Sequence, residues 1–112
     1  MPMKFIKNQI IQGPLAGYSS APFRRLIWEH SSPLFCTTEM ISAKDLRYRR
    51  QNPKRFLHRD PVEKKLCYQL SGNEPEDLAF ATEIISQLGA EIIDLNCGCP
   101  KPKIRKKNKF KK

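Results

Sequence analysis

The chain has 112 residues, the length of about one domain, with 39% hydrophobic and 29% charged residues. No apolar run approaches the roughly eighteen residues that cross a bilayer, so we expect no membrane span. Met1 to Lys4 contain no hydrophobic signal region, which predicts a cytoplasmic protein. The formal net charge is +10, a value that suits a polyanionic partner such as nucleic acid.

The positive charge is concentrated at the C-terminal end. Residues 101–112 hold eight Lys and Arg residues and no acid, whereas residues 1–100 hold 13 cations and 11 acids. We therefore predict one folded domain over residues 1–100 and a basic, disordered tail over residues 101–112. A milder basic cluster runs from Lys44 to Lys65. Both stretches could bind phosphates, although a charge run is more often a solvated face.

The four cysteines do not form the pattern of a disulfide framework, because nothing in the sequence marks secretion. Cys97 and Cys99 make a single Cys-x-Cys pair, which falls short of the ligand spacing of structural zinc sites, so we expect no metal site. Cys36 and Cys67 lie in apolar runs and are expected in the core.

The first half of the chain alternates strand and helix signals. Residues 10–15 form a short apolar run closed by Gly and Pro, which predicts a strand and a loop. A helix follows with Ser20 as its N-cap, Pro22 in its first turn, and an apolar face. That face comprises Phe23, Leu26, Ile27 and His30. Residues 34–40 predict one strand, and the basic segment to about residue 57 predicts helix broken near Pro53.

The second half repeats the alternation. Residues 65–70 predict a strand, with its exit loop at residues 71–73. The clearest helix begins at Pro75 with acids in its first turn and ends at Gly89. Its apolar stripe comprises Leu78, Ala81, Ile84, Ile85 and Leu88. Residues 92–96 predict a fourth strand.

This order of elements predicts an α/β fold with parallel strands. A doubly wound nucleotide fold is disfavoured, because the loop after the first strand has neither G-x-G-x-x-G nor a Walker lysine. A (β/α)8 TIM barrel collects its functional residues at the carboxyl ends of its strands, which is where the polar and small residues fall here. We therefore predict the N-terminal half of a TIM barrel, truncated after the fourth strand, since a whole barrel needs about 250 residues.

Several residues at these strand ends could carry chemistry. Cys99 lies in a tight Gly-Cys-Pro turn, three residues after the Asn96 amide, and its thiol could donate a proton or could simply belong to a structural loop. Gln69 can both donate to and accept from a heteroaromatic ring, and the turn at residues 14–17 lets backbone approach a flat ligand. For Glu39 we favour an orienting hydrogen bond over a catalytic role, and for His30 and His58 structural roles. Phe5 and Trp28 are expected in the core.

Four motifs occur in order along the chain: GPLAGYSSAPFR at 13–24, TEM at 38–40, QLSG at 69–72 and GAEIIDLNCGCP at 89–100. Together they resemble the N-terminal part of the tRNA-dihydrouridine synthase family, over roughly residues 10–104. The resemblance implies a flavoprotein that reduces the C5=C6 bond of uridines in tRNA with FMN, recharged by NADPH.

The resemblance also implies roles for individual residues. The family's proton-donating cysteine falls on Cys99. Its flavin contacts fall on Pro14, Leu15, Ala16 and Gln69. Its substrate-binding positions fall on Asn96 and Lys103. Arg24, Arg25 and the cluster from Lys44 to Lys65 could hold the RNA backbone.

The chain departs from the family pattern at Leu15, Ser20 and Cys97, and after Ile104 it becomes lysine-rich. Because the flavin-phosphate loops and the helical tRNA-binding domain belong to the second half, we expect a shortened form, and the sequence leaves open whether this form is active or inactive. A missing C-terminal half or self-association could complete the barrel. The alternatives are another FMN-dependent pyrimidine dehydrogenase-like barrel and a non-catalytic RNA-binding remnant that acts through residues 101–112.

Overall fold

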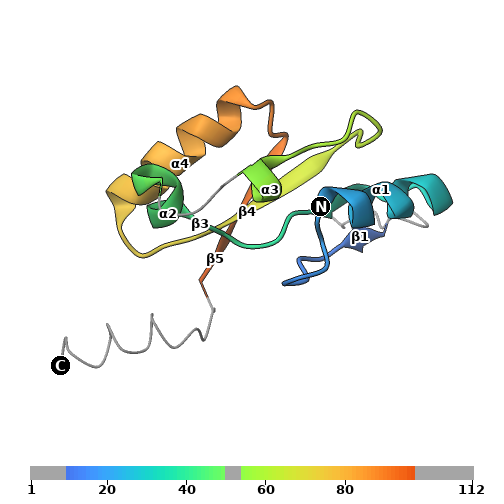
Figure 1. Ribbon diagram of the computed structural model, residues 1–112, viewed down its shortest axis with the longest axis horizontal. Helices are drawn as coiled ribbons and strands as arrows, with labels where there is room; N and C mark the ends of the chain where they lie inside the picture. Colours follow the sequence, from blue (N-terminus) through green and yellow to red (C-terminus); the bar gives the residue numbers. More distant parts are fainter. Residues whose placement is uncertain (1–9, 50–53, 98–112) are drawn as a thin grey trace, which may run out of the picture.

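The structure is a computed structural model that describes residues 10–49 and 54–97 (Figure 1). Its elements, in chain order, are β1 (Ile11–Gln12), α1 (Ala21–His30), β2 (Phe35–Thr37), β3 (Ile41–Ser42), α2 (Ala43–Tyr48), α3 (Lys54–Leu57), β4 (Leu66–Ser71), α4 (Pro75–Gln87) and β5 (Ile92–Asn96). The basic tail at residues 101–112 and the helix break near Pro53 lie outside the described residues. Within the described ranges, no helix is long and apolar enough to span a membrane.

The strands form one five-stranded sheet in which every pair is parallel. β1 pairs with β2, β2 and β3 both pair with β4, and β5 pairs with β4 as well. β4 therefore lies at the centre of the sheet, and β1 reaches it only through β2. The predicted α/β class with parallel strands is confirmed, and so are the bounds of the strand at residues 92–96.

The strand predicted over residues 34–40 exists but is shorter: β2 covers Phe35–Thr37, and a separate strand, β3, follows at Ile41–Ser42. Thr37 of β2 pairs with Cys67, and Ile41 of β3 pairs with Leu70. The chain therefore advances four residues from β2 to β3 while β4 advances three. This extra residue resembles a β-bulge. Thr38 explains it: its backbone N–H donates to Cys67 O at 2.9 Å, while its Oγ1 accepts from Gln69 N at 3.1 Å. A side-chain oxygen thus stands where a main-chain carbonyl would continue the ladder.

The hydrophobic core lies between the sheet and the helices α2 and α4, which pack side by side (Figure 1). It is built from Ile41, Ala43, Leu46, Leu66, Tyr68, Leu70, Ala81 and Ile85. Every residue of β4 is buried, as expected for a parallel strand covered on both faces. Alternation along β4 directs Leu66, Tyr68 and Leu70 to the core and leaves Gln69 on the opposite face.

The helix α4 confirms the clearest sequence prediction. Of its predicted stripe, Ala81 and Ile85 are fully buried and Leu78 and Ile84 pack against the core. Leu88 lies beyond the helix and is 48% exposed. Gly89 ends the helix with a positive φ of 85°, a conformation that glycine adopts without steric cost.

The helix α1 differs from the sequence prediction on two points. Leu26, assigned to its apolar face, is 53% exposed, whereas Arg24 is 1% exposed. Ser20 occupies the N-cap position, but its side chain makes no capping hydrogen bond. The apolar spacing failed here because α1 lies away from α2 and α4 (Figure 1) and is held by a charged residue instead.

Arg24 forms a buried ion pair with Glu63. Its Nε lies 2.6 Å from Glu63 Oε1 and its Nη2 lies 3.2 Å from Glu63 Oε2. Arg24 also donates to Ser19 O at 2.7 Å and to His58 O at 2.8 Å, and Glu63 Oε2 accepts from Asp60 N at 3.0 Å. Both side chains are almost wholly excluded from solvent. This network ties α1 and the loop before it to the segment that leads into β4.

The predicted core positions of Cys36 and Cys67 are confirmed, since both side chains are buried. Burial raises the pKa of the Cys36 thiol to about 11. Burial also raises the pKa of the Cys67 thiol. The half-buried Trp28 only partly meets its core prediction, and Phe5 lies outside the described residues.

The Arg24 network predicts a large loss of stability when one partner is removed. Replacing Arg24 by Met should lower the free energy of unfolding by about 3–5 kcal/mol, because Glu63 would remain buried without its counter-charge. Urea unfolding followed by circular dichroism measures this. Arg25→Ala is the matched control: Arg25 is exposed on the same helix and pairs with Glu29 and, at 3.8 Å, with Asp60, so its urea midpoint should stay close to that of the unchanged chain. Equal midpoints for both variants would refute the assignment.

The raised thiol pKa values predict selective alkylation. At about pH 8.5, where an ordinary thiol is half ionised, Cys36 stays protonated and inaccessible, whereas the exposed Cys97 should react with iodoacetamide. Peptide mass mapping of the folded chain should therefore find label on Cys97 and none on Cys36 or Cys67. Labelling of all three at similar rates in the folded chain would contradict their burial.

Candidate functional site

The carboxyl ends of parallel strands share one edge of a sheet, and the candidate site lies along that edge here. The loop at residues 13–20 follows β1, residues 38–40 follow β2, and Asn96 ends β5. These segments carry residues of the first, second and last of the four sequence motifs. Gln69 on β4 belongs to the remaining motif, QLSG. The described structure thus places residues that are far apart in the chain on a common edge.

The loop after β1 is closed by Ser19. The Ser19 hydroxyl is buried, donates to Leu15 O at 3.1 Å and accepts from Leu15 N at 2.9 Å. Tyr18 N and Ser19 N also donate to Leu15 O. Because the loop folds back on its own backbone, the side chains of Pro14, Leu15 and Ala16 remain exposed, Leu15 by 48%. These three predicted flavin contacts are therefore displayed outward together.

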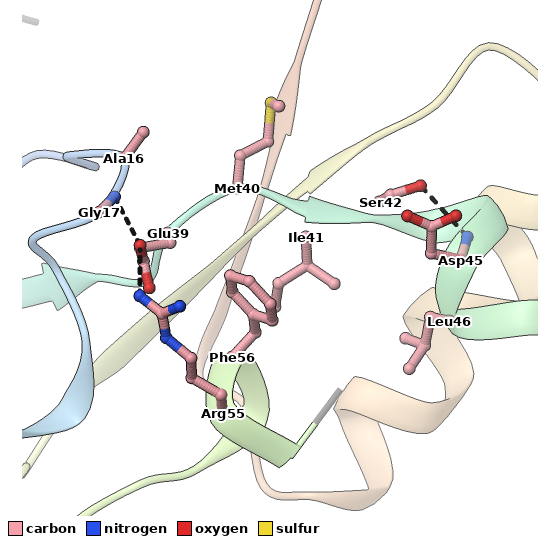
Figure 2. Close-up of a pocket in the computed structure, with 10 residues that line it drawn as sticks. All are labelled: Ala16, Gly17, Glu39, Met40, Ile41, Ser42, Asp45, Leu46, Arg55 and Phe56. Atoms are coloured by element: carbon pink, nitrogen blue, oxygen red, sulfur yellow. Dashed lines mark hydrogen bonds and ion pairs between the residues drawn. The ribbon is translucent and has the colours of Figure 1, made fainter. Parts of the chain in front are cut away.

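Glu39 joins this loop to the end of β2. Its Oε1 accepts from Gly17 N at 2.6 Å and lies 3.5 Å from Arg55 Nη2 (Figure 2). Gly17 has a positive φ of 81°, which the turn requires. The second oxygen, Oε2, is buried without a hydrogen-bond partner among the described residues. The predicted orienting hydrogen bond of Glu39 is confirmed.

A cavity of about 330 Å³ opens beside Glu39 (Figure 2). Ala16 and Gly17 line one side, Met40 and Ile41 the sheet side, and Phe56 the side of α3. The predicted site residues Gln69 and Asn96 do not line this cavity. The first loop and the two amides thus lie at the same edge of the sheet, but in the described residues they do not line one pocket.

Gln69 and Asn96 are brought together by the pairing of β4 with β5. Asn96 Nδ2 donates to Gln69 Oε1 at 3.4 Å, and Gln69 Nε2 donates to Asp94 Oδ2 at 2.8 Å. Gln69 is 6% exposed, and its backbone N–H is held by Thr38. Asp94 received no role from the sequence, although its spacing two residues before Asn96 on a strand puts both side chains on one face. That spacing was the available signal.

Two predicted site residues, Cys99 and Lys103, lie outside the described residues. The neighbouring Cys97 is exposed, and its thiol contacts Leu95 O at 3.8 Å. Among the described residues, no three His, Cys, Asp or Glu side chains gather closely enough to hold a metal ion.

The structure corrects the expected RNA-binding role of Arg24, since that side chain is buried and committed to Glu63. Other basic residues are also paired with acids. Arg25 pairs with Glu29 and Asp60, Arg47 with Asp77, and Arg59 with Glu91 at 2.7 Å. The Arg59 hydrogen bond lowers the pKa of the Glu91 carboxyl. Within the cluster from Lys44 to Lys65, Arg47, Arg55 and Arg59 are therefore engaged in ion pairs that connect parts of the fold.

The sequence matches the family model described as dihydrouridine synthase over residues 11–109. The chain is 34% identical to tRNA-dihydrouridine synthase B of Proteus vulgaris over 103 residues, which cover 91% of this chain and 31% of that protein. It is 33% identical to the probable tRNA-dihydrouridine synthase 1 of Synechocystis sp., covering 91% of this chain and 28% of that protein. With tRNA-dihydrouridine synthase B of Escherichia coli K12 the identity is 32%, over 91% of this chain and 32% of that protein.

The chain thus spans about a third of the length of these relatives. The matched region contains the edge of the sheet that carries the loop at residues 13–20, Glu39, Gln69 and Asn96. Since the family model matches most of the chain, this protein belongs to the dihydrouridine synthase family.

Proposed function

We propose that the chain forms the first part of the (β/α)8 barrel of a tRNA-dihydrouridine synthase, an FMN-dependent oxidoreductase that works in the cytoplasm. The observation that carries the proposal is the meeting of Gln69 with Asn96 on the edge that also displays Pro14, Leu15 and Ala16. In barrel enzymes the active site lies at this edge. The names of the relatives support uridines of tRNA as the substrate.

The residues present fit a flavin by the chemistry of their donors and acceptors. The Gln69 amide offers both N–H and C=O, which suits the pyrimidine edge of an isoalloxazine ring, where donors and acceptors alternate. The exposed apolar side chain of Leu15 and the small Ala16 suit the flat face of such a ring. Pro14, Leu15, Ala16 and Gln69 would hold the flavin.

When bound, FMN recharged by NADPH would supply a hydride for one carbon of the uridine C5=C6 bond. The Cys99 thiol would give the proton to the other carbon, and the resulting thiolate would regain a proton from solvent. Asn96 and Lys103 would bind the uracil ring, which must leave its stack to reach a site at the mouth of a barrel. The side chains of the site thus divide into those that hold the cofactor, those that hold the base, and the thiol that delivers the proton.

A closed barrel requires about eight strands, whereas the described sheet has five, with β1 at one end. We propose that a C-terminal half or a second copy supplies the remaining strands, and that the chain alone is less active than the closed barrel. Self-association of the 112-residue chain would show as a defined dimer in sedimentation.

The flavin proposal predicts a role for Gln69 that a surface glutamine does not share. The purified chain, mixed with FMN and passed through a desalting column, should keep visible flavin absorbance. Gln69→Ala should weaken FMN binding by about tenfold, the cost of one to two hydrogen bonds. Gln87→Ala, at the exposed end of α4, is the matched control and should bind like the unchanged chain. A folded chain that retains no flavin would refute the proposal for these residues.

The proton-donor proposal predicts that Cys99→Ala lowers the rate of uridine reduction in tRNA by about 10²–10⁴-fold and leaves flavin binding unchanged. Cys97→Ala is the matched control, because Cys97 is exposed and has no assigned role. Dihydrouridine in tRNA is measured by nucleoside mass spectrometry. Reduction at full rate in Cys99→Ala would exclude this proton donor. Activity on free uracil but not on tRNA would favour a pyrimidine dehydrogenase, and tRNA binding without reduction would favour the RNA-binding remnant.

A further inference from the structure

We propose that Asp94 is a positioning residue that fixes the orientation of two side-chain amides, first that of Gln69 and through it that of Asn96. The consequence for catalysis rests on the proposed function, but the orienting contact itself does not. The contact is short: Gln69 Nε2 lies 2.8 Å from Asp94 Oδ2. Asp94 and Gln69 are direct partners in the register of β4 and β5.

The orientation follows from the hydrogen-bonding capacities of the groups. An ionised carboxylate can only accept hydrogen bonds, so it selects the NH₂ end of the Gln69 amide. The carbonyl end, Oε1, is then directed to Asn96, whose Nδ2 donates to it at 3.4 Å. If the Gln69 amide turned over, its carbonyl oxygen would face the carboxylate and its NH₂ would face the Asn96 NH₂. Both contacts would become repulsive, so the charge on Asp94 selects the orientation of Gln69 and, through it, favours the observed contact with Asn96.

The surroundings of Asp94 favour an orienting role over a structural one. Asp94 is exposed, whereas Gln69 beside it is 6% exposed, so the carboxylate contributes little buried surface to the fold. No ion pair among the described residues involves Asp94, and its one side-chain hydrogen bond there is to Gln69. The backbone N–H of Gln69 is itself held by Thr38 Oγ1 at 3.1 Å. With the main chain held on one side and the amide on the other, Gln69 has one defined position.

For the proposed flavin site, this contact determines which end of the Gln69 amide donates to the ring and which end accepts. A glutamine amide that can rotate presents its donor and acceptor to the flavin ring in either of two arrangements. Only one of these arrangements complements the ring. With Asp94 in place, Gln69 presents one pattern only. A preorganised amide costs less on binding than one that must be ordered.

The orienting contact is tested by NMR of the side-chain NH₂ groups in the ¹⁵N-labelled 112-residue chain. In the unchanged chain, the Gln69 NH₂ proton that faces Asp94 should resonate downfield of its geminal partner and exchange slowly with water. Asp94→Asn, nearly identical in size, should bring the two proton shifts together, speed exchange about tenfold, and move the Asn96 NH₂ signals as well. Glu83→Gln on α4 removes one carboxylate elsewhere and should change neither amide.

The direction of the effect is tested by Asn96→Ala, which should leave the Gln69 signals with slow exchange, because Asp94 still holds that amide. Backbone signals of β4 and α4 report whether each variant is folded. Unchanged Gln69 signals in Asp94→Asn, or loss of the Gln69 pattern in Asn96→Ala, would overturn the proposal.

A second arm measures the functional consequence. Asp94→Asn should weaken FMN binding several-fold and shift the visible spectrum of the bound flavin, and Glu83→Gln should do neither. If the amide signals respond as expected but the unchanged chain binds no FMN, the proposed function fails while the orienting role stands. If FMN binds equally well to Asp94→Asn and to the unchanged chain, with the same spectrum, the link between orientation and the flavin is refuted.

Discussion

The buried pair of Arg24 and Glu63 is the constraint on which the arrangement of the site depends. α1 packs little apolar surface, with Leu26 half exposed, so apolar burial alone does not fix its place. The guanidinium joins four chain segments at once: α1, the loop at Ser19, the residues after α3 at His58, and Glu63 before β4. Since the loop that carries Pro14, Leu15 and Ala16 ends at Ser19, the contact of Arg24 with Ser19 O fixes one end of that loop.

Two regions of the molecule are held together by different kinds of interaction. On one face of the sheet, apolar packing between β4, α2 and α4 supplies the core. At the carboxyl-end edge, single polar contacts set the geometry instead: Glu39 holds Gly17, Thr38 replaces a ladder carbonyl at Gln69, and Asp94 holds the Gln69 amide. Such contacts have defined directions, which apolar packing lacks. An edge built from them suits a site that must present particular donors and acceptors.

The sequence predicted the structure correctly where a single local signal dominated. The helix from Pro75 and the strand at residues 92–96 follow from periodicity, breakers and the first-turn acids, and Cys36 and Cys67 lie in the core as expected. It misled where a long-range polar partner overrode local pattern. The spacing of Leu26 indicates burial, but Glu63, 39 residues from Arg24, buries the arginine instead. The break between β2 and β3 depends on Thr38 bonding across to Gln69, and the contact of Asp94 with Gln69 requires the register of β4 and β5. These pairings join residues that are far apart in the sequence, so local sequence patterns do not predict them.

If the edge formed by the first loop, Gln69 and Asn96 binds a flavin, FMN must shift the NMR signals of residues at that edge and leave the signals of α4 unchanged. Titration of the ¹⁵N-labelled chain with FMN, followed by backbone amide shifts, tests this most directly because it reports location as well as binding. We predict saturable shifts at Leu15, Ala16, Gln69 and Asn96, with α4 unaffected. Shifts confined to residues 101–112, where lysines would attract the phosphate of FMN without any site, would contradict flavin binding at this edge, as would a titration without shifts.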